Sequence, residues 1–513
     1  MKKLKTVLSL ILACAMCVPF VFAAFASEEN GSYTITNPYS GIDWENIGTY
    51  KTALHTHTTA SDGDYTLKEM LERHAQADFD IVAVTDHGTV NYGWGEENVN
   101  DFIYKVMSIT EKGRHGLEYL GSSGSFADGV SYTYSTAANG DDYLKLSDGK
   151  TILRLPYGIE NNAVSVNAHV NSWFTDYTDN SLNDYEQAIS SIDGLGGICV
   201  INHPGEYTKA RYELHSANAY NTDNLAYRYY VNKFTYLLDK YDGCIGIDIN
   251  SKGDNRTRFD RILWDTLLER FAANGESVYA IASSDAHTKD IVDTGYSLLL
   301  MPELTNAAAE NALRNGEFFA ASHCLGNYEE LTEIAASVKE FYGETELYGK
   351  LIGTADAMEE KIAGIENGSY DADDSIGITY TSLDSEGYTT TADPEITYIG
   401  TDEAQDTITI GSENALIVRW ISNGKLIATT KADTATLDLN EYSAQLGDYV
   451  RAEVFGEGGV IYTQAFLLNA QANAGTQPPS EGFMDAGIFD FLFAIIKNWT
   501  DILTRTFANL VRC

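Results

Sequence analysis

The sequence predicts an α/β protein with a parallel sheet, open or closed as a barrel, followed by a small all-β domain. Two observations favour the α/β part, which spans about residues 44–325. Short and almost wholly apolar runs are typical of strands buried on both faces of a parallel sheet, and they occupy residues 79–85, 197–201, 244–249 and 278–282. Longer segments with helical periodicity lie between them, at residues 67–77, 225–240, 259–273 and 306–315.

A small β-sandwich is expected at residues 394–469, where the pattern changes to short alternating strands. Residues 415–421 and 425–430 are separated by Ser422-Asn423-Gly424, and Asn-Gly between two apolar runs is a strong hairpin signal. A further strand is expected at residues 449–455.

Two stretches interrupt this organisation and are interpreted as additions to it. Residues 108–150, rich in Gly, Ser and Tyr, are expected to form an insertion inside the α/β part. Residues 327–393, rich in Gly, Thr, Ser and acidic side chains, are expected to form an acidic insertion or linker region between the two parts.

The N-terminus has the order of parts of a secretory signal peptide. Three lysines within residues 1–5 precede an uncharged run that closes with Ala24-Phe25-Ala26, so residues 1–26 are expected to be removed on export. An uncleaved membrane anchor is the alternative, because about twenty apolar residues could span a bilayer. The small residues at the cleavage site favour removal, and the protein is expected to be secreted or held at the cell surface.

The C-terminus is expected to consist of a linker, residues 471–482, and an amphipathic helix, residues 483–513. The apolar side chains of this helix recur at spacings of three and four, at Phe489, Leu492, Ile496, Trp499, Leu503, Phe507 and Leu510. Its apolar stretches are too short to cross a membrane. Contact with a membrane surface, contact with a partner protein, and packing onto its own chain all remain open.

The charge balance excludes one class of partner. The chain has 34 basic and 74 acidic residues and a formal net charge of −40, whereas binding to a long nucleic acid requires a surplus of basic side chains. With 44% hydrophobic residues, the chain nevertheless has enough apolar material for folded cores.

Several histidines and carboxylates follow the ends of predicted strands. His55 and His57 are two residues apart in a strand, so that both imidazoles point to one face, and Asp62 lies in the turn that follows. The other candidates are His87, Glu160, His169, His203, Asp285 and His287. Residues just beyond the carboxyl ends of parallel strands meet on one face of the sheet or barrel, so these side chains are expected to share one rim.

Six imidazoles and three carboxylates at one rim indicate a metal centre. This donor set suits borderline divalent cations, namely Zn2+, Mn2+ or Fe2+. Nine donors exceed the coordination number of a single ion, so two or three ions that share a bridging carboxylate are expected. The remaining histidines are interpreted differently: His74 lies among apolar helix residues and is expected to pack, whereas His115, His215 and His323 do not follow strands.

These motifs, taken in order, resemble those of the PHP (polymerase and histidinol phosphatase) family of metal-dependent phosphoesterases over about residues 48–322. The motifs that carry the resemblance are His55-x-His57 with Ser61-Asp62-Gly63, Thr85-Asp86-His87-Gly88, Gly158-Ile159-Glu160, His169, Asn202-His203-Pro204 and Ser284-Asp285-Ala286-His287. The resemblance implies a distorted (β/α)7 barrel with a trinuclear site at the carboxyl ends of the strands.

The resemblance also implies which residues would share each ion. One ion would be bound by His55, His57, Glu160 and Asp285, and a second would share Glu160 and add His169 and His203. The third would be bound by Asp62, His87 and His287. The long insertion before Thr151 and the presence of Asp248 depart from the family pattern, so the shape of the pocket is not implied.

The resulting hypothesis is a secreted metal-dependent hydrolase that cleaves phosphoester bonds of small phosphorylated substrates through a metal-bound hydroxide. Arg154, Arg256 and Arg258 could clamp a phosphate, although surface salt bridges are the expected role of each. A metal-dependent amide or ester hydrolase and a cell-surface binding protein with a structural metal site are the alternatives, and an exonuclease is a lesser one. The sequence does not fix the substrate, the metal or the oligomeric state.

Overall fold

The computed structural model describes residues 32–96, 99–110, 114–163, 168–178, 184–371, 378–384, 387 and 389–470. The expected signal peptide (1–26), linker (471–482) and amphipathic helix (483–513) lie outside these residues. Within the described part of the chain, no helix is long and apolar enough to cross a membrane.

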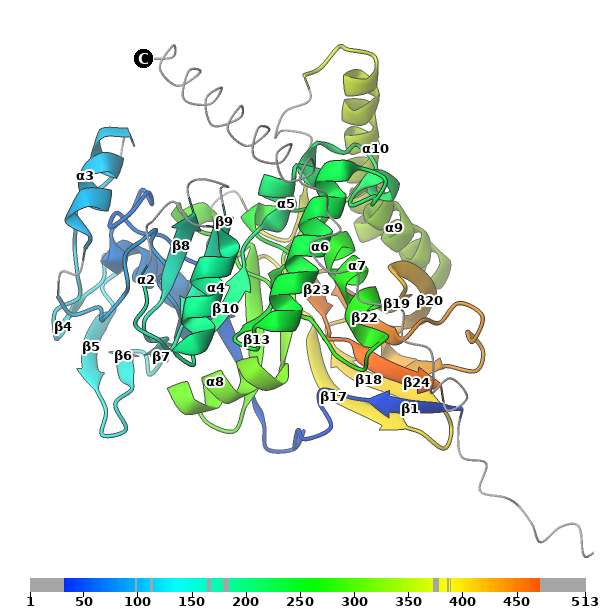
Figure 1. Ribbon diagram of the computed structural model, residues 1–513, viewed down its shortest axis with the longest axis horizontal. Helices are drawn as coiled ribbons and strands as arrows, with labels where there is room; N and C mark the ends of the chain where they lie inside the picture. Colours follow the sequence, from blue (N-terminus) through cyan, green and yellow to red (C-terminus); the bar gives the residue numbers. More distant parts are fainter. Residues whose placement is uncertain are drawn as a thin grey trace, which may run out of the picture.

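The strands of the α/β part belong to two sheets (Figure 1). The first sheet has the order β12-β11-β10-β9-β8 and consists of β8 (Ile159–Ala163), β9 (Ala168–Trp173), β10 (Ile198–Ile201), β11 (Cys244–Asp248) and β12 (Tyr279–Ile281). The second contains the order β14-β13-β2-β3-β7, formed by β2 (Gly48–Ala53), β3 (Ile81–Val82), β7 (Thr151–Arg154), β13 (Gly295–Met301) and β14 (Phe318–Ser322). Strands β10, β11 and β12 are parallel, as are β2, β3 and β7, which agrees with the predicted α/β class.

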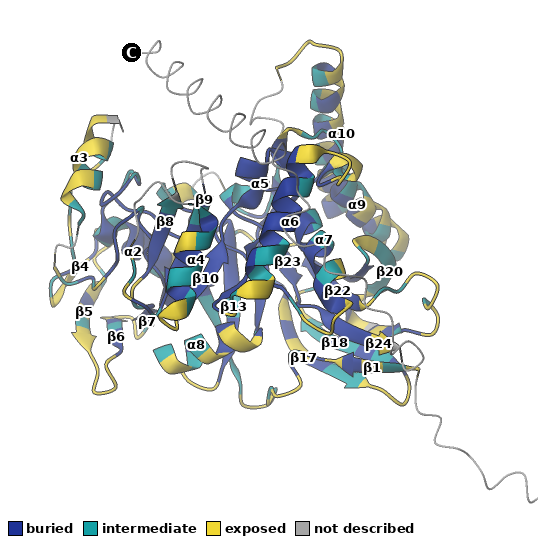
Figure 2. Cartoon of the chain, in the orientation of Figure 1, coloured by how far each residue is buried: buried dark blue, intermediate teal, exposed yellow. Residues whose placement is uncertain are grey.

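Helices cover the outer faces of these sheets (Figure 1), and they are α2 (Leu67–Gln76), α4 (Tyr185–Gly194), α6 (Leu225–Lys240) and α7 (Asp260–Ala272). Helix α8 (Asn306–Asn315) lies at the lower end of the sheets in the same view. Thr66 and Glu69 begin α2 with a capping box, in which each side chain accepts a hydrogen bond from the other residue's backbone. Helix α4 is exposed on its outward face, whereas α7 is buried along most of its length (Figure 2). Two further helices, α3 (Asp101–Thr110) and the short α5 (Pro204–Thr208), lie toward the top of Figure 1.

The space between the two sheets is filled with apolar side chains from both. Leu54, Ile81 and Leu153 from one sheet belong to the same buried cluster as Val200 and Ile281 from the other. Helix α8 contributes to this cluster through its small and apolar residues. The α/β part therefore has a packed interior like that of a barrel.

A closed (β/α)7 barrel is not confirmed, because the described strands do not form one continuous ladder. The two sheets are joined instead by isolated bridges at the ends of the strands. Thr56 pairs with Ala286 across one seam, and His87 pairs with Glu160 across the other. Both bridges involve a predicted site residue or its chain neighbour, so the sheets approach each other most closely where the site was expected.

The stretch expected as an insertion, residues 108–150, includes an antiparallel extension of the second sheet. Strands β4 (Ser123–Ser125), β5 (Ser131–Thr136) and β6 (Asp142–Leu146) continue the sheet outward from β7. The stretch expected as an acidic insertion or linker, residues 327–393, contains two long helices, α9 (Tyr328–Tyr342) and α10 (Glu346–Glu366), which pack against each other. It also contains the short β16 (Tyr380–Thr381), which pairs with β15 (Cys324–Leu325).

The C-terminal region is rich in β structure, as expected. A three-stranded sheet of β17 (Glu395–Asp402), β18 (Thr407–Glu413) and β21 (Ala435–Asp438) shares a core with strands of the large sheet. Those strands are β19 (Ile417–Ser422), β20 (Lys425–Lys431), β22 (Tyr449–Gly456), β23 (Gly459–Tyr462), β24 (Phe466–Ala470) and β1 (Tyr33–Thr36). Strands β19 and β20 form the expected hairpin, in which Asn423 and Gly424 have φ values of 50° and 63°.

The β-rich region is continuous with the α/β part through backbone hydrogen bonds. Strand β23 pairs antiparallel with β14, so one sheet extends from β7 through β14 into β22 and β24. The β-rich region is therefore anchored to the same sheet that supports one half of the candidate site.

Candidate metal centre

The structure brings all nine predicted site residues together at one end of the two sheets. His55 and His57 follow β2, with Asp62 in the next turn, and His87 follows β3. Glu160 and His169 lie on β8 and β9, His203 follows β10, and Asp285 and His287 follow β12. A cavity of about 250 Å³ opens at this place, and most of these side chains line it.

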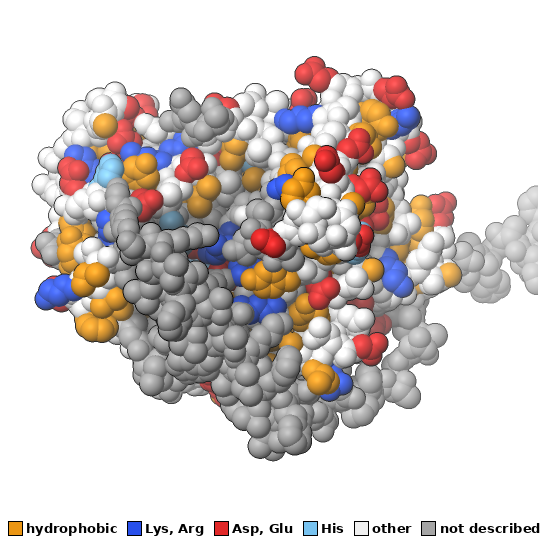
Figure 3. All heavy atoms as spheres, turned by 90° about the horizontal axis from the view of Figure 1, so that it is seen from above, with side chains coloured by type: hydrophobic (Ala, Val, Ile, Leu, Met, Phe, Trp, Pro, Cys, Tyr) orange, Lys and Arg blue, Asp and Glu red, His pale blue; other side chains and the backbone are white. Residues whose placement is uncertain are grey.

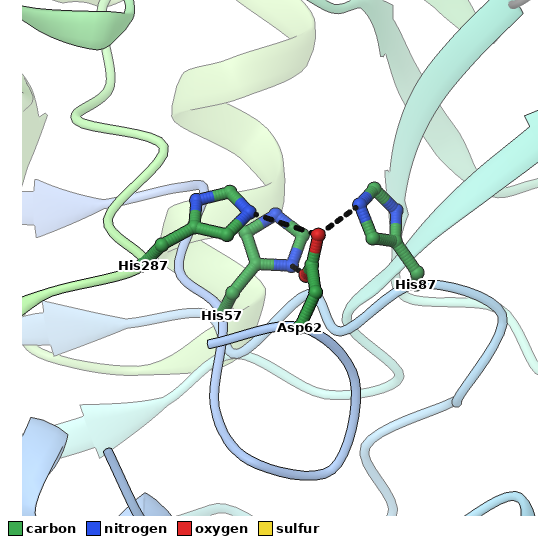
Figure 4. A group of neighbouring side chains, drawn as sticks. All are labelled: His57, Asp62, His87 and His287. Atoms are coloured by element: carbon green, nitrogen blue, oxygen red, sulfur yellow. Dashed lines mark ion pairs between the residues drawn. The ribbon is translucent and has the colours of Figure 1, made fainter. Parts of the chain in front are cut away.

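Asp62 contacts three imidazoles on one side of the cavity (Figure 4). Its Oδ2 lies 3.3 Å from His87 Nε2 and 3.2 Å from His287 Nε2. Its Oδ1 lies 3.4 Å from His57 Nδ1. This group corresponds to the third ion of the predicted set, with His57 as an additional neighbour.

Glu160 is the hub of the site and is completely buried. Its two carboxylate oxygens lie 2.8–3.4 Å from one nitrogen each of five imidazoles, those of His55, His57, His87, His169 and His203. A single carboxylate that faces donors on both of its oxygens can bridge two ions.

Asp285 completes the arrangement through contacts with three of the imidazoles and with Lys252. Its Oδ1 lies 3.3 Å from His55 Nε2 and 3.1 Å from His57 Nε2. Its Oδ2 lies 3.6 Å from His203 Nε2 and contacts the Lys252 ammonium group. Asp285 has a φ of 48° and His203 one of 24°, so both residues adopt strained backbone conformations at the site.

The spacing of these atoms fits the coordination of metal ions. Four groups of three or four donor atoms, each spanning less than 4.8 Å, can be drawn from the nine residues. Ligands about 2.1 Å from a tetrahedral zinc ion lie about 3.4 Å from one another, close to the 3.1–3.4 Å that separates many of the donors here. Because the groups share His55, His57, His87 and Glu160, the site can hold more than one ion.

Two buried oxygen atoms support the same interpretation. Glu160 Oε2 and Asp285 Oδ1 accept no hydrogen bond from the described residues, although imidazole nitrogens lie within 3.5 Å of both. A buried carboxylate oxygen without a hydrogen bond is costly unless a cation compensates it. The residues present therefore fit a group of divalent cations.

The protonation states are set by burial and by the density of charge. Burial opposes ionisation of Glu160 and Asp62, but the surrounding imidazoles outweigh it and hold the pKa of both carboxyls well below their usual range. Burial lowers the pKa of His55 to about 4, so its imidazole is neutral, the state required of a ligand. Burial and His87 oppose protonation of His57, but its contacts with Asp285 and Glu160 raise its pKa to about 9. The buried negative charge thus favours cations, whether protons or metal ions.

Residues around the nine ligands hold them in place. Asn202, in the predicted Asn-His-Pro motif, donates a hydrogen bond of 2.8 Å to Glu160 Oε1. Asn162, which the sequence analysis did not single out, lies 2.8 Å from His87 Nδ1 through its amide oxygen and 3.1 Å from His169 Nε2 through its amide nitrogen. Asp86 accepts hydrogen bonds from Thr58 and Ser61 and so fixes the turn that presents Asp62. The position of Asp86 beside His87 in the Thr-Asp-His-Gly motif is the sequence signal that could have indicated this supporting role.

A basic wall borders the cavity on the side of Asp285. Lys252 contacts Asp285, and its Nζ lies 3.5 Å from Glu206 Oε2, while Arg256 donates a hydrogen bond of 2.8 Å to Glu206 Oε1. Tyr207 also lines the cavity, and its hydroxyl lies 2.9 Å from His169 Nδ1. In the view from above, Lys and Arg side chains gather near the middle of the face (Figure 3).

Only part of this wall was predicted from the sequence. Arg256 was one of three arginines considered as phosphate clamps, and it lines the cavity. Arg154 instead pairs with Asp142, and Arg258 donates a hydrogen bond to the Glu213 carbonyl oxygen. Lys252, Glu206 and Tyr207 lie in loops and a short helix without a recognisable motif.

The histidines expected to lie outside the site do so. His74 is buried on α2, with Nε2 3.1 Å from the Thr56 hydroxyl and Nδ1 2.7 Å from the Met70 carbonyl oxygen. It thus packs beneath the strand that carries His55 and His57. Among the described residues, His115, His215 and His323 take no part in the groups of metal-ligating atoms.

A comparison with protein families supports the predicted resemblance. Residues 53–225 match the PHP domain family, a range that includes seven of the nine site residues and ends before Asp285 and His287. No curated protein sequence matches the chain. A solved structure similar to this chain is a two-domain protein from Bacteroides vulgatus containing a predicted PHP-like metal-dependent phosphoesterase. It is 11% identical, with 86% of this chain and 92% of that chain covered and a TM-score of 0.30. The family match confirms the expected resemblance to the PHP family over residues 53–225.

Proposed function

We propose that this protein is an exported metal-dependent phosphoesterase that hydrolyses small phosphorylated compounds. The observation that carries the proposal is the convergence of six imidazoles and three carboxylates at one cavity that Lys252 and Arg256 also line. When bound, divalent cations polarise phosphoryl oxygens and generate a nucleophile from water at neutral pH.

The basic wall is suited to binding the phosphoryl group. Lys252 and Arg256 both contact Glu206, which is buried and holds the two cationic groups at the cavity surface. Burial opposes ionisation of Glu206, but Lys252 and the neighbouring basic groups keep its pKa below the usual range, so Glu206 remains an anion that orients them. Arginine and lysine at fixed positions recognise phosphoryl oxygens through charge-assisted hydrogen bonds.

Tyr207 provides a proton donor beside the proposed metal ligands. Burial raises the pKa of its hydroxyl well above the ordinary value, so the group stays protonated at neutral pH. A protonated hydroxyl at the edge of the cavity can donate a hydrogen bond to an oxygen of the substrate.

The cavity and the overall charge both favour a small substrate. A volume of about 250 Å³ lies below the range of about 300–1,000 Å³ that is typical of pockets for drug-sized ligands. The net charge of −40 disfavours a long polyanion, whereas a small phosphorylated compound interacts chiefly with the local cations.

The proposal includes export, because residues 1–26 have the composition of a signal peptide. A secreted or surface-held enzyme would encounter phosphorylated compounds outside the cell. N-terminal sequencing of the protein recovered from the producing cells tests this part, with a mature protein beginning at Ser27 as the expected result. An unprocessed N-terminus would instead support a membrane anchor.

Hydrolysis of a substrate panel tests the activity. The mature protein loaded with Mn2+ or Zn2+ is expected to cleave an aryl phosphate and to lose this activity with a chelator. Parallel amide and carboxylic ester substrates distinguish a phosphoesterase from other metal-dependent hydrolases. Cleavage of amides or esters without cleavage of phosphoesters would replace the proposed reaction.

A further inference from the structure

The loop that carries Lys252 has an unusual backbone. Lys252, Gly253 and Asp254 form a short 3-10 segment in which all three residues have positive φ values, of 53°, 59° and 64°. Only glycine adopts this conformation readily, and two of the three residues here have side chains. Such a turn persists only where surrounding contacts hold it in place.

Asp254 supplies those contacts from within the turn. Its carboxylate is completely buried and accepts a hydrogen bond of 2.9 Å from Arg261 Nη1 and one of 3.2 Å from the Gly326 amide. Arg261 Nη1 also donates to Asn250 Oδ1, 3.0 Å away, on the other side of the turn. Arg261, at the start of α7, therefore fixes both ends of the segment that presents Lys252 to the cavity.

Arg261 is itself held from the C-terminal half of the chain. Its Nη2 donates a hydrogen bond of 2.6 Å to Glu330 Oε2 on α9. The other oxygen of Glu330 lies 3.5 Å from Nη1 of Arg419 on β19, which also pairs with Glu453 on β22. Acidic and basic side chains alternate along this path, so that each charge is compensated by its neighbours.

The path is buried along its whole length. The side chains of Arg261, Glu330, Arg419 and Glu453 are 4–8% exposed, and a cavity of about 330 Å³ lies beside them. Removal of one partner from a buried charge pair leaves the other uncompensated and strongly destabilises the elements that the pair joins. The path therefore couples the position of the Lys252 turn to α9 and to the β-rich region.

We infer that Arg261 is a positioning residue for the candidate site and that, through Arg261 and Glu330, the β-rich region sets the position of Lys252. For the role of Lys252 as a phosphoryl-binding group, the inference rests on the proposed function. The β-rich region thereby helps to determine the shape of the substrate pocket.

Hydrogen exchange measured by mass spectrometry tests the inference without any need for activity. In the full-length mature protein, Arg261→Met is expected to accelerate exchange in a peptide covering residues 250–259 about tenfold or more, because a buried pair that holds the turn is lost. Exchange in a peptide covering residues 54–62 is expected to stay unchanged. Arg154→Met is the matched control, since it removes a buried Arg–Asp pair that lies elsewhere.

Glu330→Gln provides a second variant that keeps the size of the side chain. It is expected to accelerate exchange at residues 250–259 by a smaller factor, because Arg261 retains its contact with Asp254. If Arg261→Met does not yield folded protein, Glu330→Gln decides the matter alone. Unchanged exchange at residues 250–259 in the folded variants, or the same acceleration in Arg154→Met, would overturn the inference.

Kinetics separate positioning from a purely structural role. With metal content unchanged, Glu330→Gln is expected to raise KM for an aryl phosphate severalfold, about three- to tenfold, and to leave kcat within about twofold, because Lys252 binds the phosphoryl group in ground and transition states alike. A three- to tenfold fall in kcat with an unchanged KM would contradict this role. If the wild-type protein is inert toward phosphoesters, the proposed function fails, while the exchange experiment still decides whether the β-rich region positions the turn.

Discussion

Replacement of Glu160 by Gln probes the hub of the proposed metal centre. The change removes one negative charge and keeps the shape of a side chain that is completely buried. Glu160 contributes to two of the four groups of metal-ligating atoms, together with His55 and His57 in one and with His87 and His169 in the other. An amide has one acceptor oxygen in place of two, so it cannot bridge two ions.

The size of the effect follows from the role of Glu160 in both groups. Loss of a residue that merely orients a ligand typically lowers metal affinity 10- to 100-fold. Loss of a shared ligand is therefore expected to cost at least about 100-fold, or about 2.7 kcal/mol, for each ion that it bridges. Metal content after dialysis, measured by elemental analysis, should fall by at least one ion per chain.

Glu206→Gln is the matched control, because Glu206 is a buried carboxylate in the same cavity that pairs with Lys252 and Arg256. This variant is expected to retain its metals. Titration of metal-free protein with Mn2+ or Zn2+ gives the affinities directly. Wild-type stoichiometry and affinities within about threefold in Glu160→Gln would refute the assignment of Glu160 as a bridging ligand.

Three further predictions follow from the same site. Lys252→Met is expected to raise KM for an aryl phosphate about tenfold or more without loss of metal, and steady-state kinetics with an unchanged KM would contradict the proposed phosphoryl contact. Loading with Mn2+ or Zn2+ at about 100 times the dissociation constant should add about 2.7 kcal/mol to the free energy of unfolding for each ion, and thermal unfolding that is insensitive to metal would exclude a centre of this kind. Burial raises the pKa of Asp248 to about 7, so the folded state keeps a proton on this residue that the unfolded state loses, and the contribution of Asp248 to the stability of the metal-free protein falls as the pH rises from about 4 to about 7. Asp248→Asn should remove this fall, which amounts to at most about 4 kcal/mol, in urea unfolding followed at several pH values, and an identical pH profile in both proteins would refute it.

The candidate site was largely predictable because its residues follow a simple rule. His55 and His57 lie at the end of one parallel strand and His203 at the end of another, and the carboxyl ends of such strands meet on one face. The spacing of these motifs was visible in the sequence, as was the hairpin at Asn423-Gly424. Each of these signals is local in the sequence. The fold then brings together site residues that lie far apart in the chain.

The basic wall was not predictable from local patterns. Lys252 reaches the cavity because three residues adopt positive φ values, and only one of the three is glycine. Contacts with Arg261 and Gly326 hold that turn, and no local sequence pattern predicts that these two residues contact it. Tyr207 and Glu206 lie on the short helix after β10, where they are buried, and no sequence motif marks either residue as part of the cavity.

Two features of the fold differ from the sequence-based expectations for physical reasons. The strands do not close into one ladder, because β2 pairs with β13, and β13 and β14 continue the sheet into β23, so that only isolated bridges cross the two seams. The segment 327–393 contains α9, in which Leu331, Ile334, Ala335 and Val338 have helical spacing and are buried. That periodicity was the available signal, and the acidic composition of the segment as a whole obscured it.

The most direct test of the account is a comparison of phosphoester hydrolysis by the metal-loaded and the chelator-treated mature protein, with metal content measured on the same samples. The account predicts two or three divalent ions per chain, hydrolysis of an aryl phosphate that depends on them, and loss of both in a variant combining His57→Ala and Asp285→Ala. A protein that binds these ions but is inert on a broad panel of phosphomonoesters and phosphodiesters would contradict the proposed function. A protein that binds fewer than two ions would contradict the proposed metal centre.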